Sequence, residues 1–268
     1  MYRITNNALV TMTQLQQQMD LTANNLSNLD TTGYKARHGR FNELLSQQMD
    51  NQRNVGAEVG RVTPEGIRLG NGARLTDTFM NTAPGQLKQT ERELDLALGT
   101  ENQYFRVEVV TDAGTDVQFT RQGNFYTSPG AAGQVYLVTS DGSRVLDSNG
   151  TPIQLPENAS EITFREDGTV LYTLPSGEQE THMQQVGVAE ILKPQLMTAE
   201  SGRLSLPDLG ALGVDEGQVI ANVAAENRSI IQSSLEGSNV NLSQELTDMM
   251  KAQRAYQMNS RSISIADQ

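Results

Sequence analysis

The sequence predicts an α+β fold in which a central antiparallel β domain, a distorted barrel or sandwich of hairpins, is flanked by N- and C-terminal helices that pair as a coiled coil. Apolar residues recur every three or four positions at both chain ends, as they do on one face of a helix. Between the ends, short apolar runs alternate with Asp-Gly and Asn-Gly pairs, which are strong hairpin signals. Trp is absent and aromatic residues make up 5%, so the core must rest on aliphatic side chains.

The N-terminal zone, residues 1–33, predicts the first helix of a terminal coiled-coil domain. Its apolar stripe consists of Ile4, Ala8, Met12, Leu15, Met19, Thr22, Leu26 and Leu29. The residues between them are mostly Thr, Gln and Asn, which can hydrogen-bond to packed neighbours without the cost of burying charge. The pattern ends at Asp30–Gly33, which is typical of a helix stop and turn.

Residues 34–77 are expected to form an extended connecting segment. It contains one short helical pattern, Phe41–Gln48, and a glycine-rich stretch, Gly66–Gly72. The glycines lack the strand-to-helix setting of a dinucleotide-binding loop, and we interpret the stretch as a flexible connection.

Residues 78–226 are expected to form the central β domain. The predicted strands are Gln103–Val110, Val117–Thr120, Val135–Thr139, Glu161–Phe164, Val170–Leu174 and Val186–Ile191. The predicted turns are Asp112–Gly114, Asp141–Gly142, Ser148–Gly150, Asp167–Gly168 and Ser176–Gly177.

Residues 227–268 are expected to form a connecting segment and the C-terminal helix. Its seam alternates four and three residues through Leu242, Leu246, Met249, Gln253, Tyr256, Ser260 and Ile263. Asn241 and Ser243 are candidate N-caps. A coiled-coil seam must pack against a second helix, and the N-terminal helix carries a comparable apolar stripe. The alternative is that each helix packs separately on the β domain.

Composition narrows the function classes. A net charge of −12 argues against binding nucleic-acid phosphates or an anionic membrane surface. With no cysteine, the chain has no disulfide, thiolate metal site or cysteine nucleophile. Met1–Asn7 lacks the basic start and apolar run of a signal peptide, so we expect any export to need no cleaved signal.

No arrangement of residues indicates catalysis, a cofactor or a metal ion. His38 and His182 have no second histidine or carboxylate at ligand spacing, and we interpret both as ordinary surface residues. The number of carboxylates does not by itself exclude a catalytic pair of the kind that glycosidases use. Buried acids with a raised pKa usually lie among aromatic residues, which are scarce here, and we expect no enzyme.

Both chain ends resemble the bacterial flagellar rod and hook family. Ala23–Lys35 is similar to the family's N-terminal signature, an Asn-rich helix end followed by Thr, Gly, an aromatic and a basic residue. Leu235–Leu242, Glu245-Leu246 and Gln253–Ser260 resemble its C-terminal signature. Further inward, Phe119–Phe125 is similar to the Tyr-Thr-Arg-x-Gly-x-Phe segment of the family.

Other residues resemble one member of this family or differ from the family's usual residues. Gly66–Arg74 looks most like the distal rod protein, and Gly85–Leu87 and Asp95–Leu98 also have related residues in the family. At Leu98–Phe105 the chain lacks the usual Ile-x-Gly-x-Gly-Phe-Phe run, and Ala8–Val10 replaces a small-residue step. The hook, the proximal rod and other axial subunits therefore remain alternatives.

The resemblance implies a structural subunit of the flagellar basal-body rod that self-assembles into a helical tube and transmits torque from motor to hook. It also implies export through the flagellar apparatus, contacts with itself and with other axial proteins, and no small-molecule substrate. We expect the terminal helices to be only partly ordered in the free subunit. The rival function classes are an extracellular β-domain adhesin or glycan binder and a carboxylate enzyme.

The resemblance and the stripes together give two sets of candidate site residues. The expected assembly residues are Met12, Leu15, Met19, Leu26, Leu242, Leu246, Met249, Tyr256 and Ile263. The expected junction residues are Asn24, Asn25, Asn28, Gly33, Tyr34, Gly237, Asn239, Arg254 and Asn259. Gly33 and Gly237 are expected to turn the chain with positive φ. The asparagines either bond to backbone groups of adjacent segments or cap helices.

Overall fold

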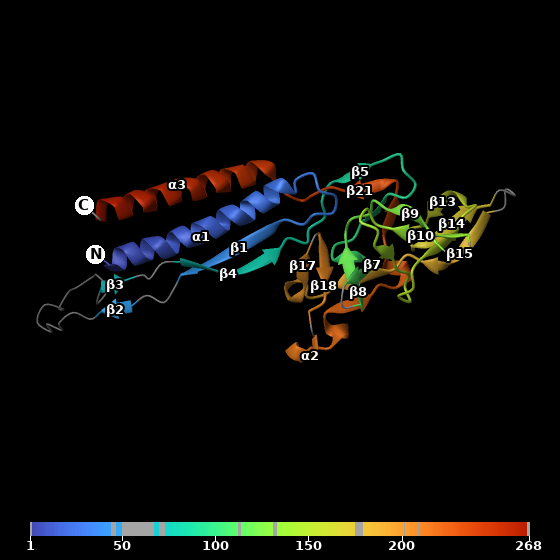
Figure 1. Cartoon of the computed structure of the whole chain (residues 1–268), viewed down its shortest axis with the longest axis horizontal. Coiled ribbons are helices and arrows are strands. Elements are labelled where there is room, and N and C mark those ends of the chain that lie inside the picture. The colour runs from blue at the N-terminus through green and yellow to red at the C-terminus, as the bar shows by residue number, and fades with distance from the viewer. Residues whose placement is uncertain are drawn as a thin grey trace, which may run out of the picture. The chain divides into compact units, whose positions relative to one another are not determined.

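A computed structural model of the chain describes residues 2–43, 47–49, 67–69, 73–111, 114–130, 133–174, 179–200, 202–207 and 209–266 (Figure 1). The chain divides into two compact units. The first, here called the helical unit, comprises Met1–Ser27, Arg37–Phe79 and Asn241–Gln268. The second, the β unit, comprises Asn28–Ala36 and Met80–Val240.

The helical unit is built on α1 (Tyr2–Ser27) and α3 (Leu242–Ala266), which lie side by side in opposite directions (Figure 1). Asn241 caps α3, since its side-chain oxygen accepts the N–H groups of Ser243 and Gln244 at 3.1 and 3.2 Å. This confirms the cap predicted at Asn241. No helix in the described part of the chain is long and apolar enough to cross a membrane.

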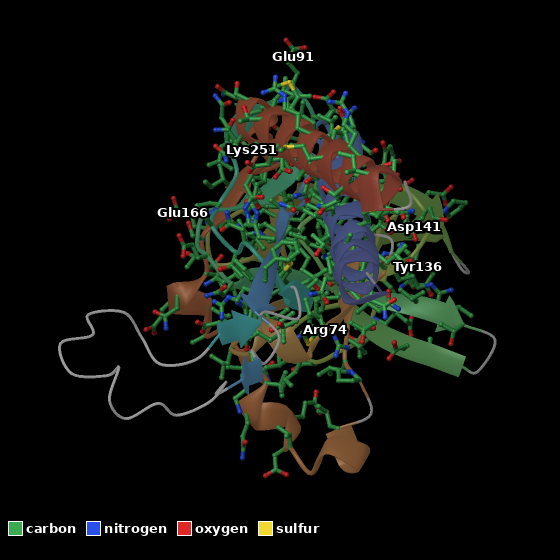
Figure 2. The ribbon with its side chains drawn as sticks, turned by 90° about the vertical axis from the view of Figure 1, so that its left-hand side faces the viewer. Arg74, Glu91, Tyr136, Asp141, Glu166 and Lys251 are labelled. Carbon is green, nitrogen blue, oxygen red and sulfur yellow. The ribbon has the colours of Figure 1, made fainter. Side chains whose placement is uncertain are left out.

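Two strand pairs complete the helical unit. β1 (Arg37–Glu43) pairs with β4 (Ala73–Met80), and β2 (Gln47–Met49) pairs antiparallel with β3 (Ile67–Leu69). Of the glycine-rich stretch, Gly66 and residues 70–72 lie outside the described residues. Figure 2 views the molecule from the end where the chain's two termini lie, with Lys251 marking α3.

The predicted helix at Phe41–Gln48 is wrong, because Phe41 lies within β1 and Gln47 begins β2. Tertiary contacts outweigh the local pattern here. β1 lies close against α1 and β4: a Cβ on Gly39 would stand 3.2 Å from a methyl carbon of Leu21 and 2.4 Å from one of Leu75. The backbone of Leu75 in turn donates to the Gln14 side chain at 2.6 Å.

The β unit is dominated by one ten-stranded sheet with the order β12-β10-β11-β7-β8-β18-β17, to which β9, β16 and β19 are joined at the sides. Its strands are β7 (Gln103–Thr111), β8 (Gly114–Thr120), β9 (Tyr126–Pro129), β10 (Gln134–Val138), β11 (Arg144–Val145), β12 (Gln154–Pro156), β16 (Val188–Ile191), β17 (Thr198–Glu200), β18 (Arg203–Ser205) and β19 (Ile220–Asn222).

Smaller sheets surround this one. A three-stranded antiparallel sheet contains β13 (Ser160–Phe164), β14 (Thr169–Thr173) and β15 (Gln179–Gln185). Two ribbons pair β5 (Leu87–Gln89) with β21 (Ser234–Glu236), and β6 (Leu96–Leu98) with β20 (Ile230–Gln232). Short helical turns are α2 (Leu209–Leu212), η2 (Pro194–Leu196), η3 (Glu216–Gln218) and η4 (Ala225–Asn227).

The antiparallel β prediction is confirmed, and each predicted strand overlaps an observed one. The barrel alternative is wrong, because in the described residues the sheets stay open. Gly142, Gly150 and Gly168 have φ of +86°, +83° and +89°, as their predicted turns require. Two other predicted turns fall partly or wholly outside the described residues, at 112–113 and 176–177.

Both faces of the large sheet are covered where β7 passes through it. Phe105 and Val107 point into the larger core, where the rings of Phe105 and Phe125 meet edge to face at 5.1 Å. Tyr104 points to the opposite face, into a second core with Phe119 and Leu204. This alternation explains why β7 is apolar on both sides.

The two units differ in charge. The helical unit carries 10 basic and 9 acidic residues, a net charge of +1. The β unit carries 10 basic and 23 acidic residues, a net charge of −13. The acidity of the whole chain therefore belongs to the β unit, and the helices are almost neutral.

Candidate assembly surfaces and motif junctions

The expected assembly residues fall into two groups. Met12, Leu15, Met19 and Leu26 on α1 are half-buried, as are Met249, Tyr256 and Ile263 on α3. Leu242 and Leu246 are instead 43% and 41% exposed. The most buried positions of α3 are Glu245 and Ala252, so the inner face of α3 is rotated from the expected seam.

A second group of apolar side chains on α3 points to solvent. Its exposed members, here called the outer stripe, are Leu242, Leu246, Met250, Met258 and Ile265. At 3.6 residues per turn, these spacings spread the five side chains over an arc of about 160°. The same arc contains the exposed Arg254, Gln257 and Arg261. On α1, Leu9 and Val10 are also exposed. Besides the face covered within the helical unit, helix α3 therefore exposes several large apolar side chains among polar ones.

Asn25 ties the parts of the helical unit together. It is 1% exposed, and its amide nitrogen donates to the carbonyl of Arg37 at 2.8 Å and to Glu245 Oε1 at 3.0 Å. Its amide oxygen accepts the N–H of Arg37 at 3.0 Å. One side chain thus connects α1, β1 and α3, and for Asn25 the bond to an adjacent backbone segment is the correct alternative.

A small hollow of about 150 Å³ lies beside Asn25, lined among others by His38, Glu245 and Asp248. The pKa of Asp248 is lowered mainly by a hydrogen bond from Lys251, then by one from Gln244, with a smaller effect of His38. The His38 ring also packs against Phe79, with 5.7 Å between ring centroids. No group of residues in the described part of the chain is arranged to hold a metal ion.

The β unit contains a buried ionic cluster, formed by Lys35, Arg121 and Glu236. Glu236 Oε1 accepts from Lys35 Nζ and from the backbone N–H of Gly85, both at 2.8 Å. Its Oε2 accepts from Arg121 Nε at 2.6 Å. The three side chains are at most 4% exposed, so charges far apart in the sequence meet out of water.

The two cations of the cluster are also satisfied by backbone carbonyls. Arg121 Nη1 donates to Thr100 and Gln103, each at 2.7 Å, and Lys35 Nζ donates to Ala83 at 2.8 Å. Such complete hydrogen bonding is what makes burial of an ionic group tolerable. The cluster therefore fixes the segments around residues 35, 83, 100 and 236 against one another.

Burial alone would raise the pKa of Glu236, but the hydrogen bonds and charges of Arg121 and Lys35 hold it below its ordinary value. Burial, followed by the charge of Arg121, lowers the pKa of Lys35, and Glu236 opposes that shift. Tyr104 lies 5.7 Å beneath the Arg121 guanidinium, and its pKa is raised to about 12, chiefly by burial. The short contacts indicate that the cluster holds the carboxylate ionised.

Asn239 makes a second set of backbone bonds, within the β unit. Its amide oxygen accepts the N–H of Ala36 at 2.7 Å, and its amide nitrogen donates to the carbonyls of Asn81 and Ala83 at 2.9 and 2.8 Å. The N–H of Asn81 bonds to the carbonyl of Ala36 at 2.8 Å. Asn239 thus links the backbone segments near residues 36 and 82.

Three glycines allow the backbones around the ionic cluster to approach. Gly33 has φ of +68°, and its N–H donates to the carbonyl of Glu236 at 2.8 Å. A Cβ on Gly33 would lie 2.6 Å from the backbone carbon of Arg121. A Cβ on Gly85 would lie 2.0 Å from the carbonyl oxygen of Gly237. The expectation of positive φ at Gly237 is wrong; this glycine serves a close strand approach instead.

The other junction residues have more local contacts. Asn28 Oδ1 accepts from the Thr31 hydroxyl at 3.1 Å, and the carbonyl of Tyr34 accepts the N–H of Asn239 at 3.4 Å. Asn259 bonds back to the carbonyl of Ala255 on its own helix at 3.1 Å. Asn24 and Arg254 lie exposed on α1 and α3.

The ionic cluster was not predicted, although its three residues lie inside the quoted motifs. The available signal was one charged residue within two positions of a glycine in each motif. Pairing of residues 35, 121 and 236 depends on tertiary contacts, which periodicity does not report.

Replacing Gly33 by alanine should lower the free energy of unfolding of the β unit by more than 2 kcal/mol, because a positive φ costs an alanine about 1 kcal/mol and the new methyl meets backbone atoms. The matched control is Gly142→Ala, where φ is +86° but nothing lies within 4 Å of the added Cβ. Denaturant unfolding of both variants separates the two costs. Equal losses would mean that Gly33 is needed for its φ alone.

Comparisons with known proteins cover both ends and the middle of the chain. The family model "Flagella basal body rod protein" matches residues 6–35, "Flagellar hook protein FlgE/F/G D1 domain" matches residues 102–172, and "Flagellar basal body rod FlgEFG protein C-terminal" matches residues 231–268. The three matched ranges include Asn25 and Lys35, then Arg121, and then Glu236, Asn239 and Glu245.

Curated relatives align over almost the whole chain. The flagellar hook-basal body complex protein FlhP of Bacillus subtilis (strain 168) is 36% identical over 268 residues, covering 97% of this chain and 94% of the relative. The flagellar basal-body rod protein FlgG of the same organism is 30% identical over 264 residues, covering 96% and 92%. FlgG of Caulobacter vibrioides is 30% identical over 261 residues, with the same coverage.

Proposed function

Because this chain belongs to the flagellar basal-body rod and hook protein family, we propose that copies of it self-assemble into a helical tube that transmits torque from motor to hook. The resemblance inferred from the terminal motifs is confirmed, and the chain is a structural subunit of the flagellar basal-body rod. Its family is a structural one, and we propose that the chain has no enzymatic activity.

We propose that α1 and α3 pair as a coiled coil. The two helices lie side by side and run antiparallel (Figure 1). Met12, Leu15 and Met19 on α1 are half-buried, and so are Met249 and Tyr256 on α3. The low charge of the two helices favours this, because many copies of them can then pack together without strong repulsion.

The outer stripe of α3 supports the assembly step. Five exposed apolar side chains on one helix are costly in water, and their burial becomes favourable when another copy covers them. The stripe and the surface that covers it need not be the same patch. A contact between two different patches repeats from copy to copy without closing, which produces a helical polymer.

We propose four segments: the N-terminal helix of a terminal coiled-coil domain at residues 1–33, an extended connecting segment at 34–77, a central β domain at 78–226, and a connecting segment with the C-terminal coiled-coil helix at 227–268. We further propose export through the flagellar apparatus without a cleaved signal peptide. The partners are other copies and other axial proteins, and a hook or other axial position is the alternative within the family.

Two aromatic side chains weigh against the glycan-binder alternative. Tyr126 and Tyr136, the latter labelled in Figure 2, each have an arginine over the ring, with Arg92 and Arg144 at 4.6 Å from the respective centroids. A sugar would have to displace these guanidinium groups to stack on the rings. Within the described residues, these tyrosines are therefore poor stacking platforms.

Electron microscopy of the concentrated chain tests the proposed function. Tubular or fibrous polymers with a regular helical repeat are the expected result. Particles that remain single subunits at every concentration and ionic strength, while the β unit is shown to be folded, would contradict self-assembly.

The helices of the free subunit are expected to exchange amide hydrogens quickly. Isolated helices of this composition are marginal in water, and packing within the small helical unit gives limited protection. Hydrogen exchange of a dilute sample should therefore show low protection over residues 5–28 and high protection after assembly. Strong protection of residues 5–28 in the dilute sample would show that the helical unit is already stable alone.

A further inference from the structure

Methionine is the only sulfur-containing residue of this chain, with 10 methionines and no cysteine. Oxidants that attack sulfur must therefore act on thioethers. Met258 and Met250 are 69% and 52% exposed, and both belong to the outer stripe. The other methionines whose exposure the structure describes are half-buried: Met12, Met19, Met80, Met197 and Met249.

From this distribution we propose that Met258 and Met250 are oxidation sites at which a peroxide modifies the unassembled subunit and lowers its capacity to assemble. The O–O bond of hydrogen peroxide breaks and one oxygen forms a bond to the methionine sulfur, which loses two electrons. The proton of that oxygen passes to the other oxygen, which leaves as water. This inference rests on the proposed function, because the outer stripe is the surface assigned there to contact another copy.

The chemistry of the stripe explains why oxidation matters at these positions. A thioether is apolar and adapts its shape to a neighbouring surface, whereas a sulfoxide is polar and accepts hydrogen bonds strongly. Burying a sulfoxide without a donor is unfavourable. Oxidation at both positions would therefore place two sulfoxides in each contact between copies and weaken it at two points.

The arginines of α3 strengthen the effect. Arg254 lies four residues after Met250 and four before Met258, and Arg261 lies three after Met258. Residues at these spacings are neighbours on a helix surface, and both arginines are exposed. A guanidinium is a good donor to a sulfoxide oxygen, so in the free subunit it would hold the oxidised side chain in a polar contact that an apolar contact with another copy would have to break.

Peptide mass spectrometry of the dilute full chain in hydrogen peroxide tests the sites. Sulfoxide should form at Met258 and Met250 at least threefold faster than at Met80 and Met197, which are half-buried in the β unit. Once copies have assembled, both fast sites should become slow. Equal rates at exposed and half-buried methionines would overturn the assignment, whether or not the chain assembles.

Assembly of treated protein tests the consequence. Peroxide should raise the concentration needed for assembly at least fivefold, and a mixture of the two classes of methionine sulfoxide reductase should restore it. In the double variant Met250→Leu, Met258→Leu, peroxide should leave the concentration needed for assembly the same as in the untreated variant, whereas the control Met197→Leu should show the same increase as wild type. Failure of untreated wild type to assemble counts against the proposed function alone. A double variant that assembles yet remains as sensitive as wild type would overturn this inference.

Discussion

Replacing Glu236 by glutamine is expected to lower the free energy of unfolding of the β unit by about 3–5 kcal/mol. The change removes the one anion of the ionic cluster and leaves the Lys35 and Arg121 cations buried together. Glutamine also brings an N–H₂ group to a place where Lys35, Arg121 and Gly85 already supply donors. Denaturant unfolding followed by circular dichroism measures the loss.

Two controls make this measurement specific. Glu157→Gln alters an exposed carboxylate of the same unit and should change the free energy of unfolding by less than about 0.5 kcal/mol. A double-mutant cycle with Lys35→Met then measures the coupling between Lys35 and Glu236. A coupling energy near zero would show that the cluster is a set of coincident contacts and not an interacting unit.

The same cluster should make the β unit sensitive to acid. The folded-state pKa of Glu236 lies below its ordinary value, so this residue contributes stability above the unfolded pKa of about 4.3. That contribution is lost as the pH falls through the lower folded-state value. In Glu236→Gln the decline of stability below about pH 4 should be shallower than in wild type. An unchanged decline would assign the acid sensitivity to other carboxylates.

Replacing Leu246 by aspartate is expected to abolish assembly at concentrations where wild type polymerises. Leu246 is 41% exposed in the single subunit, so the change should cost the helical unit little. At an interface between copies it would remove apolar contact and bury a charge, raising the concentration needed for assembly by at least tenfold. Sedimentation or light scattering over a concentration series gives this value.

The control variants for Leu246 separate charge from position. Leu246→Met conserves volume and apolar character and should assemble like wild type. Ser262→Asp introduces the same charge on α3 at an exposed position beside the outer stripe, and should have a much smaller effect. The melting temperature of the β unit should be unchanged in all three. A fall in Leu246→Asp would place this part of α3 in the core of the β unit.

The sequence was informative where one element has one face to bury. The stripes of α1 and α3 predicted both helices, and alternating apolar runs with Asp-Gly turns predicted the strands around Gly142 and Gly168. It failed at Phe41–Gln48, where contacts with α1 outweigh local preference. It also missed β15, whose polar sequence Gln179–Gln185 has no apolar alternation and is held by pairing with β14.

Site prediction had a similar limit. Motif resemblance identified Asn25, Gly33 and Asn239, all of which make specific contacts between backbone segments. It could not show which face of α3 is covered, because Leu242 and Leu246 continue the apolar pattern of the inner face. Helix α3 carries apolar side chains on its covered face and beside it, and periodicity alone cannot separate those covered within the subunit from those that are exposed.

The antiparallel course of α1 and α3 brings the start of one helix beside the end of the other (Figure 1). Since the chain is free of cysteine, thiols introduced at Asn6 and Ser264, both exposed, would be the sole attachment points for a donor and an acceptor dye. Energy transfer between the dyes would then report the closeness of the two helix ends in single subunits and in polymers alike. The pairing of the two helices can therefore be followed optically before, during and after assembly.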